Sequence, residues 1–165
     1  MSTRLTDVPL YSVLAADVEG VSEESRQISR LLASISFQQR TLASSLWKDS
    51  LIEEISQVSQ TCNEQGWDGY NAEPLSSLSA IRATELLELL PNDIQIPNVV
   101  PDPGGDISFE WHAGSQNDFT LGVTGQSLVY AGIFGGSSET YGEERFSRVL
   151  PLAVLGILRR YFSEV

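Results

Sequence analysis

The sequence predicts an α+β fold: a small antiparallel β-meander of three to four strands packed against helices, with a long N-terminal helical segment. Apolar residues recur at helical spacing over residues 22–64 and 75–90, whereas three segments between residues 107 and 134 alternate apolar and polar residues. Because the connections between these three segments are short and polar, neighbouring strands are expected to pair antiparallel. Helices that are grouped apart from a run of strands are typical of the α+β class.

The first helical pattern covers residues 22–64. A helix of more than about 40 residues is long for a compact domain, so two interpretations compete. One is a pair of helices with a break between about residues 36 and 50, where Ser and Gln are frequent; the other is a single helix whose first half pairs with a partner. The composition favours the break. The apolar stripe consists of Ile28, Leu31, Leu32, Ile35, Leu42, Leu46, Ile52, Ile55, Val58 and Cys62.

The second helical pattern, residues 75–90, ends before Pro91, because proline cannot continue a helix. A crossover bracketed by prolines follows, and residues 98–100 within it are expected to form a short edge strand. The main strands, a glycine-rich loop and a terminal helix complete the chain, and the third main strand is expected to be the most buried. These elements are the strands 107–112, 119–124 and 128–134, the loop 135–145 and the helix 149–162.

A structured corner separates two predicted regions, an N-terminal extension and helical segment at residues 1–65 and an α+β core at residues 66–165. The corner combines turn-forming glycines and a proline with two large aromatic residues, which lose much free energy when they stay in water. We therefore expect Trp67 and Tyr70 to pack against the sheet together with Trp111 and Tyr130. The residues assigned to this structural corner are Gly66, Trp67, Asp68, Gly69, Tyr70 and Pro74.

The chain is strongly acidic, with a formal net charge of −12. Residues 67–144 hold twelve acidic residues against the single base Arg82. A nucleic-acid-binding surface needs clustered Lys and Arg to replace counterions on phosphates, so direct binding of DNA or RNA is not expected. A basic protein partner, for example one associated with nucleic acid, suits this charge. The alternative interpretation is that the acidity serves solubility alone.

No stretch of the sequence approaches the roughly 20 apolar residues of a membrane-spanning helix, and the start does not resemble a signal peptide. Cys62 is the only cysteine, which excludes an internal disulfide. These features predict a cytoplasmic protein that does not bind membranes.

Two blocks of sequence carry a resemblance. The first runs from Gly66-Trp67-Asp68-Gly69-Tyr70 to Pro74; the second joins a strand that ends in Glu110-Trp111 to the later Tyr130-Ala131-Gly132-Ile133-Phe134. Together they resemble a group of small bacterial proteins without an assigned activity. The resemblance covers about residues 60–162 and carries over no catalytic residue. The resemblance implies a bacterial or mobile-element origin, with a role such as antiviral defence. It also implies that the gene lies beside the gene of a partner protein.

Candidate chemistry is sparse. Asp68, Asn71 and Glu73 place oxygen atoms in the corner but lack the pattern of a calcium loop, so we expect them to bond the turn backbone. Glu110 and His112 share a strand face and are able to form an acid–base pair, although no nucleophile motif accompanies them. The sequence therefore predicts no catalytic residue, no metal site and no cofactor.

The preferred hypothesis is a non-enzymatic protein-binding module, such as an antitoxin, immunity protein, inhibitor or accessory subunit. One alternative is a small enzyme or ligand sensor that uses the Glu110/His112 face and the Asp68/Glu73 corner. Another is a homo-oligomeric structural component assembled through residues 22–60. The residues expected to bind the partner are Ile28, Leu31, Leu32, Ile35, Glu139, Tyr141, Glu143 and Glu144.

Overall fold

The computed structural model describes residues 23–163; for Glu24 and residues 37–45 it describes the backbone alone. Leu42 of the predicted stripe and the extension before residue 23 therefore lie outside the described residues. The chain divides into an N-terminal unit, Met1–Gln39, and a larger unit, Arg40–Val165, which holds the sheet. None of the described helices is long and apolar enough to cross a bilayer.

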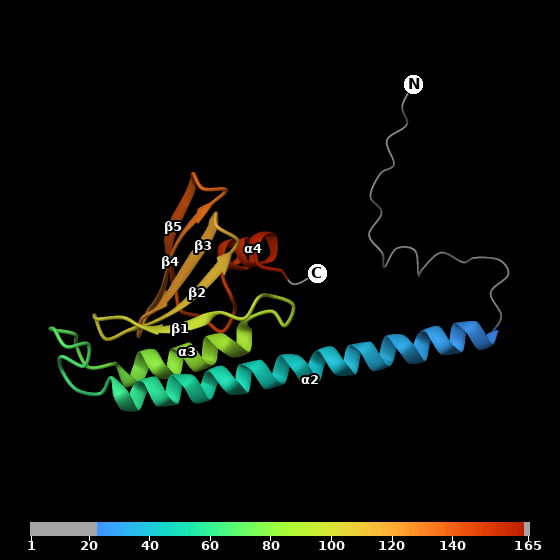
Figure 1. Cartoon of the computed structure of the whole chain (residues 1–165), viewed down its shortest axis with the longest axis horizontal. Coiled ribbons are helices and arrows are strands. Elements are labelled where there is room, and N and C mark those ends of the chain that lie inside the picture. Colours follow the sequence, from blue (N-terminus) through green and yellow to red (C-terminus); the bar gives the residue numbers. More distant parts are fainter. Residues whose placement is uncertain (1–22, 164–165) are drawn as a thin grey trace, which may run out of the picture. The chain divides into compact units, whose positions relative to one another are not determined.

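The larger unit has the predicted α+β layout, built on an open antiparallel sheet with the strand order β1-β2-β3-β4-β5 (Figure 1). The sheet has five strands, so the expected number of three to four is wrong. The additional strand, β5, replaces the loop predicted at residues 135–145. Its sequence lacks apolar alternation because it is an edge strand with little burial on either face. The strands are β1 Asn98–Pro101, β2 Ile107–Ala113, β3 Asn117–Val123, β4 Ser127–Phe134 and β5 Ser138–Arg145.

Helix α2 is a single α-helix over Glu23–Thr61, so the predicted break between about residues 36 and 50 is wrong. That region contains neither proline nor glycine. Its serines tolerate the helix because a hydroxyl is able to donate to a carbonyl one turn back, as Ser36 Oγ does to Ala33 O at 2.9 Å. Serine content alone therefore does not interrupt the helix.

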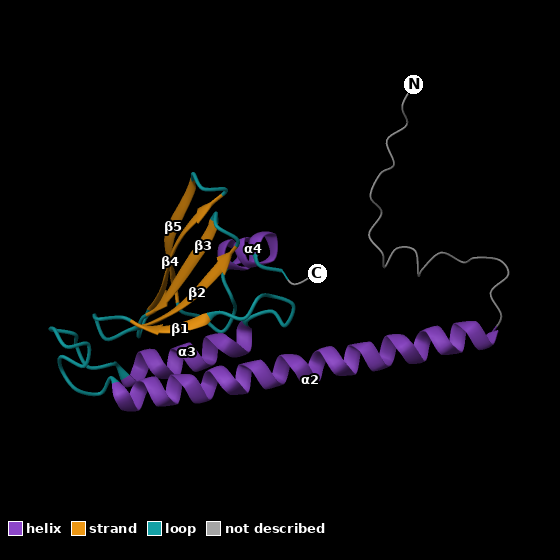
Figure 2. Ribbon diagram, viewed as in Figure 1, coloured by secondary structure: helices purple, strands orange, loops and turns teal. Residues whose placement is uncertain are grey.

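The C-terminal part of α2 packs against α3, Ser77–Leu89, in an antiparallel pair (Figure 2). At one end of the pair Leu75 N donates to Cys62 O at 2.8 Å. At the other end the ammonium of Lys48, the only lysine of the chain, donates to Leu90 O at 2.9 Å and to Glu88 O at 3.4 Å. A cation suits the negative end of the α3 dipole. Burial lowers the pKa of Lys48, although the nearby Glu88 opposes this shift.

The core lies on one face of the sheet, which α3 and α4, Leu152–Tyr161, cover. Trp111 of β2 is fully buried there, and its ring centroid lies 5.8 Å from that of Phe119 and 6.4 Å from that of Phe162. The indole N–H donates to Gln95 O at 2.9 Å, which satisfies its polar atom. Val129 and Ile133 of β4 point to the opposite face and are exposed. The prediction that this strand is the most buried is therefore wrong, because helices cover only one face.

The corner between α2 and α3 is held by its own hydrogen bonds. Asp68 Oδ1 accepts from Tyr70 N at 2.8 Å and from Ala72 N at 3.3 Å, while Trp67 Nε1 donates to Glu73 O at 3.0 Å. Trp67 is half-buried and Tyr70 is 85 % exposed, and neither belongs to the core cluster on the sheet, so the expectation that both pack on the sheet is wrong. Hydrogen bonds between side chains and the backbone, rather than aromatic burial, give the corner its shape.

The corner packs against the segment before β2, and the two backbones lie in direct contact with no side chain between them. Ser76 N donates to Gly105 O at 2.7 Å. Gly105 has a φ of +86°, and a Cβ built on it would lie 2.8 Å from Pro74 O. Both the backbone angle and this close approach therefore require glycine.

We predict that Gly105→Ala destabilises the domain more than Gly69→Ala. Gly69 has nearly the same φ, +84°, but a Cβ added to it would meet no atom within 4 Å. The Gly69 change should therefore cost only the backbone strain, about 1–2 kcal/mol, and the Gly105 change should add about 1–3 kcal/mol of overpacking. Urea unfolding measures both free energies, and equal losses would contradict close packing at Gly105.

Candidate functional site

The candidate site is the face of the sheet that the helices leave open, called here the outer face. Strand register places its residues in rows: Glu110 pairs with Thr120, which pairs with Ala131, which pairs with Tyr141. None of these residues is buried, whereas their neighbours along each of β2 and β3 are. The outer face consists of Ser108, Glu110, His112, Asp118, Thr120, Val129, Ala131, Ile133, Glu139, Tyr141 and Glu143.

His112, the only histidine of the chain, lies between two carboxylates at one end of the outer face. Its Nδ1 is 2.7 Å from Asp118 Oδ1, and its Nε2 is 3.6 Å from Glu110 Oε2. The hydrogen bond with Asp118 is the main cause that raises the pKa of His112; the charges of both carboxylates add to this, and slight desolvation opposes it. The predicted Glu110/His112 pair is therefore looser than the pair with Asp118.

The chemistry of this group is limited by its exposure. About half of the His112 side chain and more than half of the Asp118 side chain contact solvent. A histidine held by a carboxylate is able to move a proton, but general acid–base work also needs a substrate held within hydrogen-bond reach. Among the described residues, no three His, Cys, Asp or Glu side chains are arranged so that they could hold a metal ion together.

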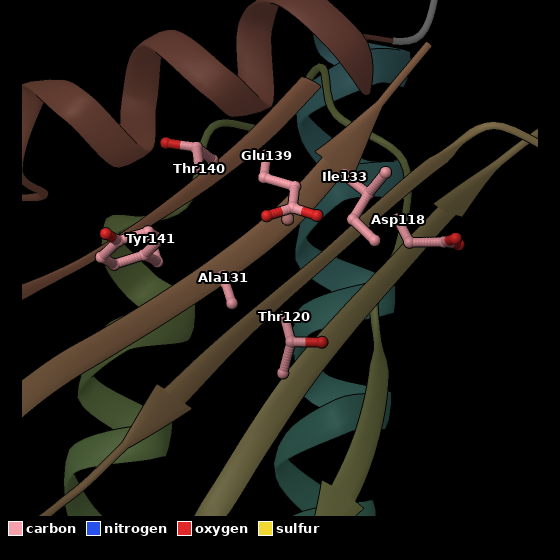
Figure 3. A pocket seen from close by; sticks show the side chains of 8 residues that line it. Asp118, Thr120, Ala131, Ile133, Glu139, Thr140 and Tyr141 are labelled. Carbon is pink, nitrogen blue, oxygen red and sulfur yellow. The ribbon is translucent and has the colours of Figure 1, made fainter. Parts of the chain in front are cut away.

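A shallow depression lies beside this pair, over β3, β4 and β5 (Figure 3). Its volume is about 300 Å³. Figure 3 shows Glu139, Ile133 and Asp118 side by side across the three strands, as the register requires. The depression thus combines an apolar floor with carboxylates at its rim. The residues that line it are Asp118, Thr120, Ala131, Gly132, Ile133, Glu139, Thr140 and Tyr141.

Four of the predicted partner-binding residues lie on β5 rather than in a loop. Glu139, Tyr141 and Glu143 face outward with the depression, and Tyr141 is 83 % exposed. Glu144 pairs with the buried Leu128, so it belongs to the opposite side of the strand. The structure therefore brings three of these residues together and separates the fourth.

The other four predicted partner-binding residues, Ile28, Leu31, Leu32 and Ile35, lie in the N-terminal unit on α2. We call them the α2 ridge. Their exposed fractions are 57 %, 61 %, 61 % and 49 %. A helical face with four large aliphatic residues at spacings of three and four is the kind that globular proteins normally bury.

The Asp68/Glu73 corner and the Glu110/His112 face do not form one site. The corner docks next to the start of β2, through the hydrogen bonds of Glu73 N to Pro103 O and of Ser76 N to Gly105 O. His112 lies near the far end of β2, and six residues of strand span roughly 20 Å. An enzyme or sensor that uses both groups on one ligand is therefore not supported by this arrangement.

Sequence reasoning missed Asp118, the main partner of His112. The sequence predicts a polar connection over residues 113–118, although Asp118 is the first outward-facing residue of β3. The contact follows from the hairpin between β2 and β3, whose register pairs Ala113 with Asn117 and therefore His112 with Asp118. A short turn centred on residue 115 would have indicated this contact.

We predict that His112 titrates above its ordinary pKa of about 6.5 and that Asp118→Asn lowers the midpoint. Because folding raises this pKa, the pair should contribute stability that is complete below the unfolded pKa and is lost as the pH rises through the folded value. The His112 imidazole signals in NMR spectra report the midpoint directly, since there is no second histidine. Asp93→Asn, in a loop, is the control, and an unchanged midpoint in Asp118→Asn would contradict the pairing.

Comparison of the chain with protein-family models, with curated proteins and with solved structures gives no match. The resemblance carried by the corner and the strand motifs stays a prediction, and the function is argued from the geometry alone.

Proposed function

We propose that the protein is a non-enzymatic binding module that docks an amphipathic helix of a partner protein on the α2 ridge. The observation that carries the proposal is the exposure of Ile28, Leu31, Leu32 and Ile35, each about half or more open to solvent. Helix-on-helix docking reuses this spacing of anchors, since residues at i, i+3, i+4 and i+7 form one face.

Burial of the α2 ridge by a partner is favoured in free energy over its exposure to water. Fully burying one such side chain stabilises a complex by about 1.5–3 kcal/mol, so covering four that are half exposed supplies roughly 4 kcal/mol before the cost of association. A micromolar complex needs about 8 kcal/mol. The ridge therefore acts as an anchor, and contacts to flanking charged residues such as Arg26 and Arg30 must complete the interface.

The charge supports a protein partner rather than nucleic acid. The larger unit is acidic over residues 67–144, and its outer face carries four carboxylates from Glu110, Asp118, Glu139 and Glu143. This surface would repel phosphates. A role as antitoxin, immunity protein, inhibitor or accessory subunit fits a small acidic chain of this kind, acting in the cytoplasm.

One observation favours a second candidate, a small enzyme or ligand sensor: the His112–Asp118 hydrogen bond of 2.7 Å beside the depression. The open geometry and the distance from the corner weigh against it. A homo-oligomer built through residues 22–60 is the third candidate, and it would use the same ridge.

We predict that a photo-crosslinking residue in place of Leu31 joins the chain to a helical segment of another protein in the native host. Ile81, 56 % exposed on α3, is the matched control position and should give no such product. Mass spectrometry of the adduct identifies the joined peptide. A crosslink to the same chain would establish the homo-oligomer instead.

In the protein that carries the crosslinking residue at position 31, the further changes Ile28→Gln and Leu32→Gln should abolish this product while α2 remains helical, because glutamine has a good helix propensity. Ile81→Gln/Leu152→Gln removes two exposed apolar residues elsewhere and should leave the crosslink intact. A monomer in sedimentation with no crosslinked protein would overturn the proposal.

A further inference from the structure

We propose that β5 and the adjoining depression form a second docking surface, which binds an extended basic segment of a protein by strand addition. This surface is separate from the α2 ridge and does not depend on it. The inference arises from three features of the larger unit: an open sheet edge, the charge of that edge and the depression beside it.

The two edge strands of the sheet, β1 and β5, differ in how easily a further strand is able to pair with them. Strand β1 is only four residues long, follows Pro97 and ends with Pro101. Short edge strands and prolines hinder the addition of another strand. Strand β5 has eight residues, contains no proline and pairs with β4 in unbroken register from Ser138 to Arg145. Its other edge is the end of the sheet.

β5 already pairs with β4 over its whole length and is therefore a preformed template. On the side facing the helices, the ring of Tyr130 lies so close to Gly142 that a Cβ at this glycine would collide with it. The strand thus packs against β4 through its only glycine. A strand that is already formed loses less conformational entropy when another strand pairs with it than a disordered segment does.

The negative charge of β5 determines which kind of strand pairs with it most favourably. β5 carries Glu139, Glu143 and Glu144 against Arg145 alone. Opposite charges placed directly across a strand pair stabilise it, whereas like charges destabilise it. A second copy would bring the same excess of glutamates to the edge, so an added strand with Lys or Arg is favoured over self-pairing.

The outward-facing residues of β5 determine the order of residue types expected in the added strand. Along β5, Glu139, Tyr141 and Glu143 alternate outward. An added strand would place a basic residue beside Glu139, an apolar residue beside Tyr141 and a basic residue beside Glu143. The apolar side chain would cover Tyr141 at the edge of the depression, whose floor is Ala131 and Ile133. The expected motif is basic-x-apolar-x-basic in an extended segment.

The test uses the full chain and a capped nine-residue peptide in which Lys and Thr alternate around a central Val. Fluorescence anisotropy should show binding, and NMR hydrogen exchange should show new protection of β5 amides. Glu139→Gln/Glu143→Gln should weaken binding about fivefold, as expected for the loss of two cross-strand charge pairs. Glu53→Gln/Glu54→Gln removes the same charge from exposed positions of α2 and should change binding less than twofold.

A version of the peptide with methylated backbone nitrogens on the pairing edge keeps the charge but cannot pair as a strand, and it should not bind. Equal weakening by both double variants, or binding of the methylated peptide, would show general electrostatic attraction and overturn the proposal. Protection of β5 that grows with protein concentration in the absence of peptide would show self-pairing and also overturn it. Neither result involves Leu31, so the proposed function at the ridge is tested separately.

Discussion

The burial of Trp111 on one face of a sheet that has helices on that face alone is the constraint on which the rest of the larger unit depends. The indole is surrounded by Phe109, Phe119 and Phe162, and its N–H is satisfied by Gln95 O. Because α3 and α4 both pack on this face, every second residue of the central strands must face solvent. The outer face with its carboxylates is the direct consequence of this one-sided core, and so is the depression over β3, β4 and β5.

The pairing of α2 with α3 includes a buried cation, although the chain as a whole is acidic. Lys48 is 8 % exposed, and its ammonium reaches the carbonyls at the C-terminal end of α3. Taking a charge out of water is costly unless hydrogen bonds compensate, and here Leu90 O and Glu88 O supply them. The helix pair in turn sets where the corner leaves α2, and the corner meets the start of β2 at Gly105. Trp47, Leu51, Ile52 and Ile55 precede the predicted boundary at residues 65 and 66, yet they belong to the same core as the sheet.

Sequence reasoning succeeded where apolar and polar residues alternate along a strand, and it failed where a strand is mostly polar or mostly apolar. The alternation of Ile107, Phe109 and Trp111 predicts β2 correctly because one face is in the core. β5 has no buried face and hence no alternation, so its sequence resembles that of a loop. The apolar run of β4 suggests burial on both sides, although Val129 and Ile133 are exposed. Of the site, the Glu110/His112 face is predictable from the sequence, but Asp118 is not, since a contact across a hairpin depends on register rather than on spacing along one strand.

The two exposed surfaces, the α2 ridge and the β5 edge, attract other molecules through different interactions. The α2 ridge exposes aliphatic side chains, which attract any apolar surface and have little selectivity of their own. In the described part of the chain, no strand pairs with the outer edge of β5. Such an edge attracts other strands, but the glutamates of β5 disfavour acidic strands and favour basic ones. The charge on β5 therefore disfavours pairing with a second copy of the same strand. A neutral edge of the same length would pair without discrimination, so the acidity of this strand has a structural reason beyond solubility.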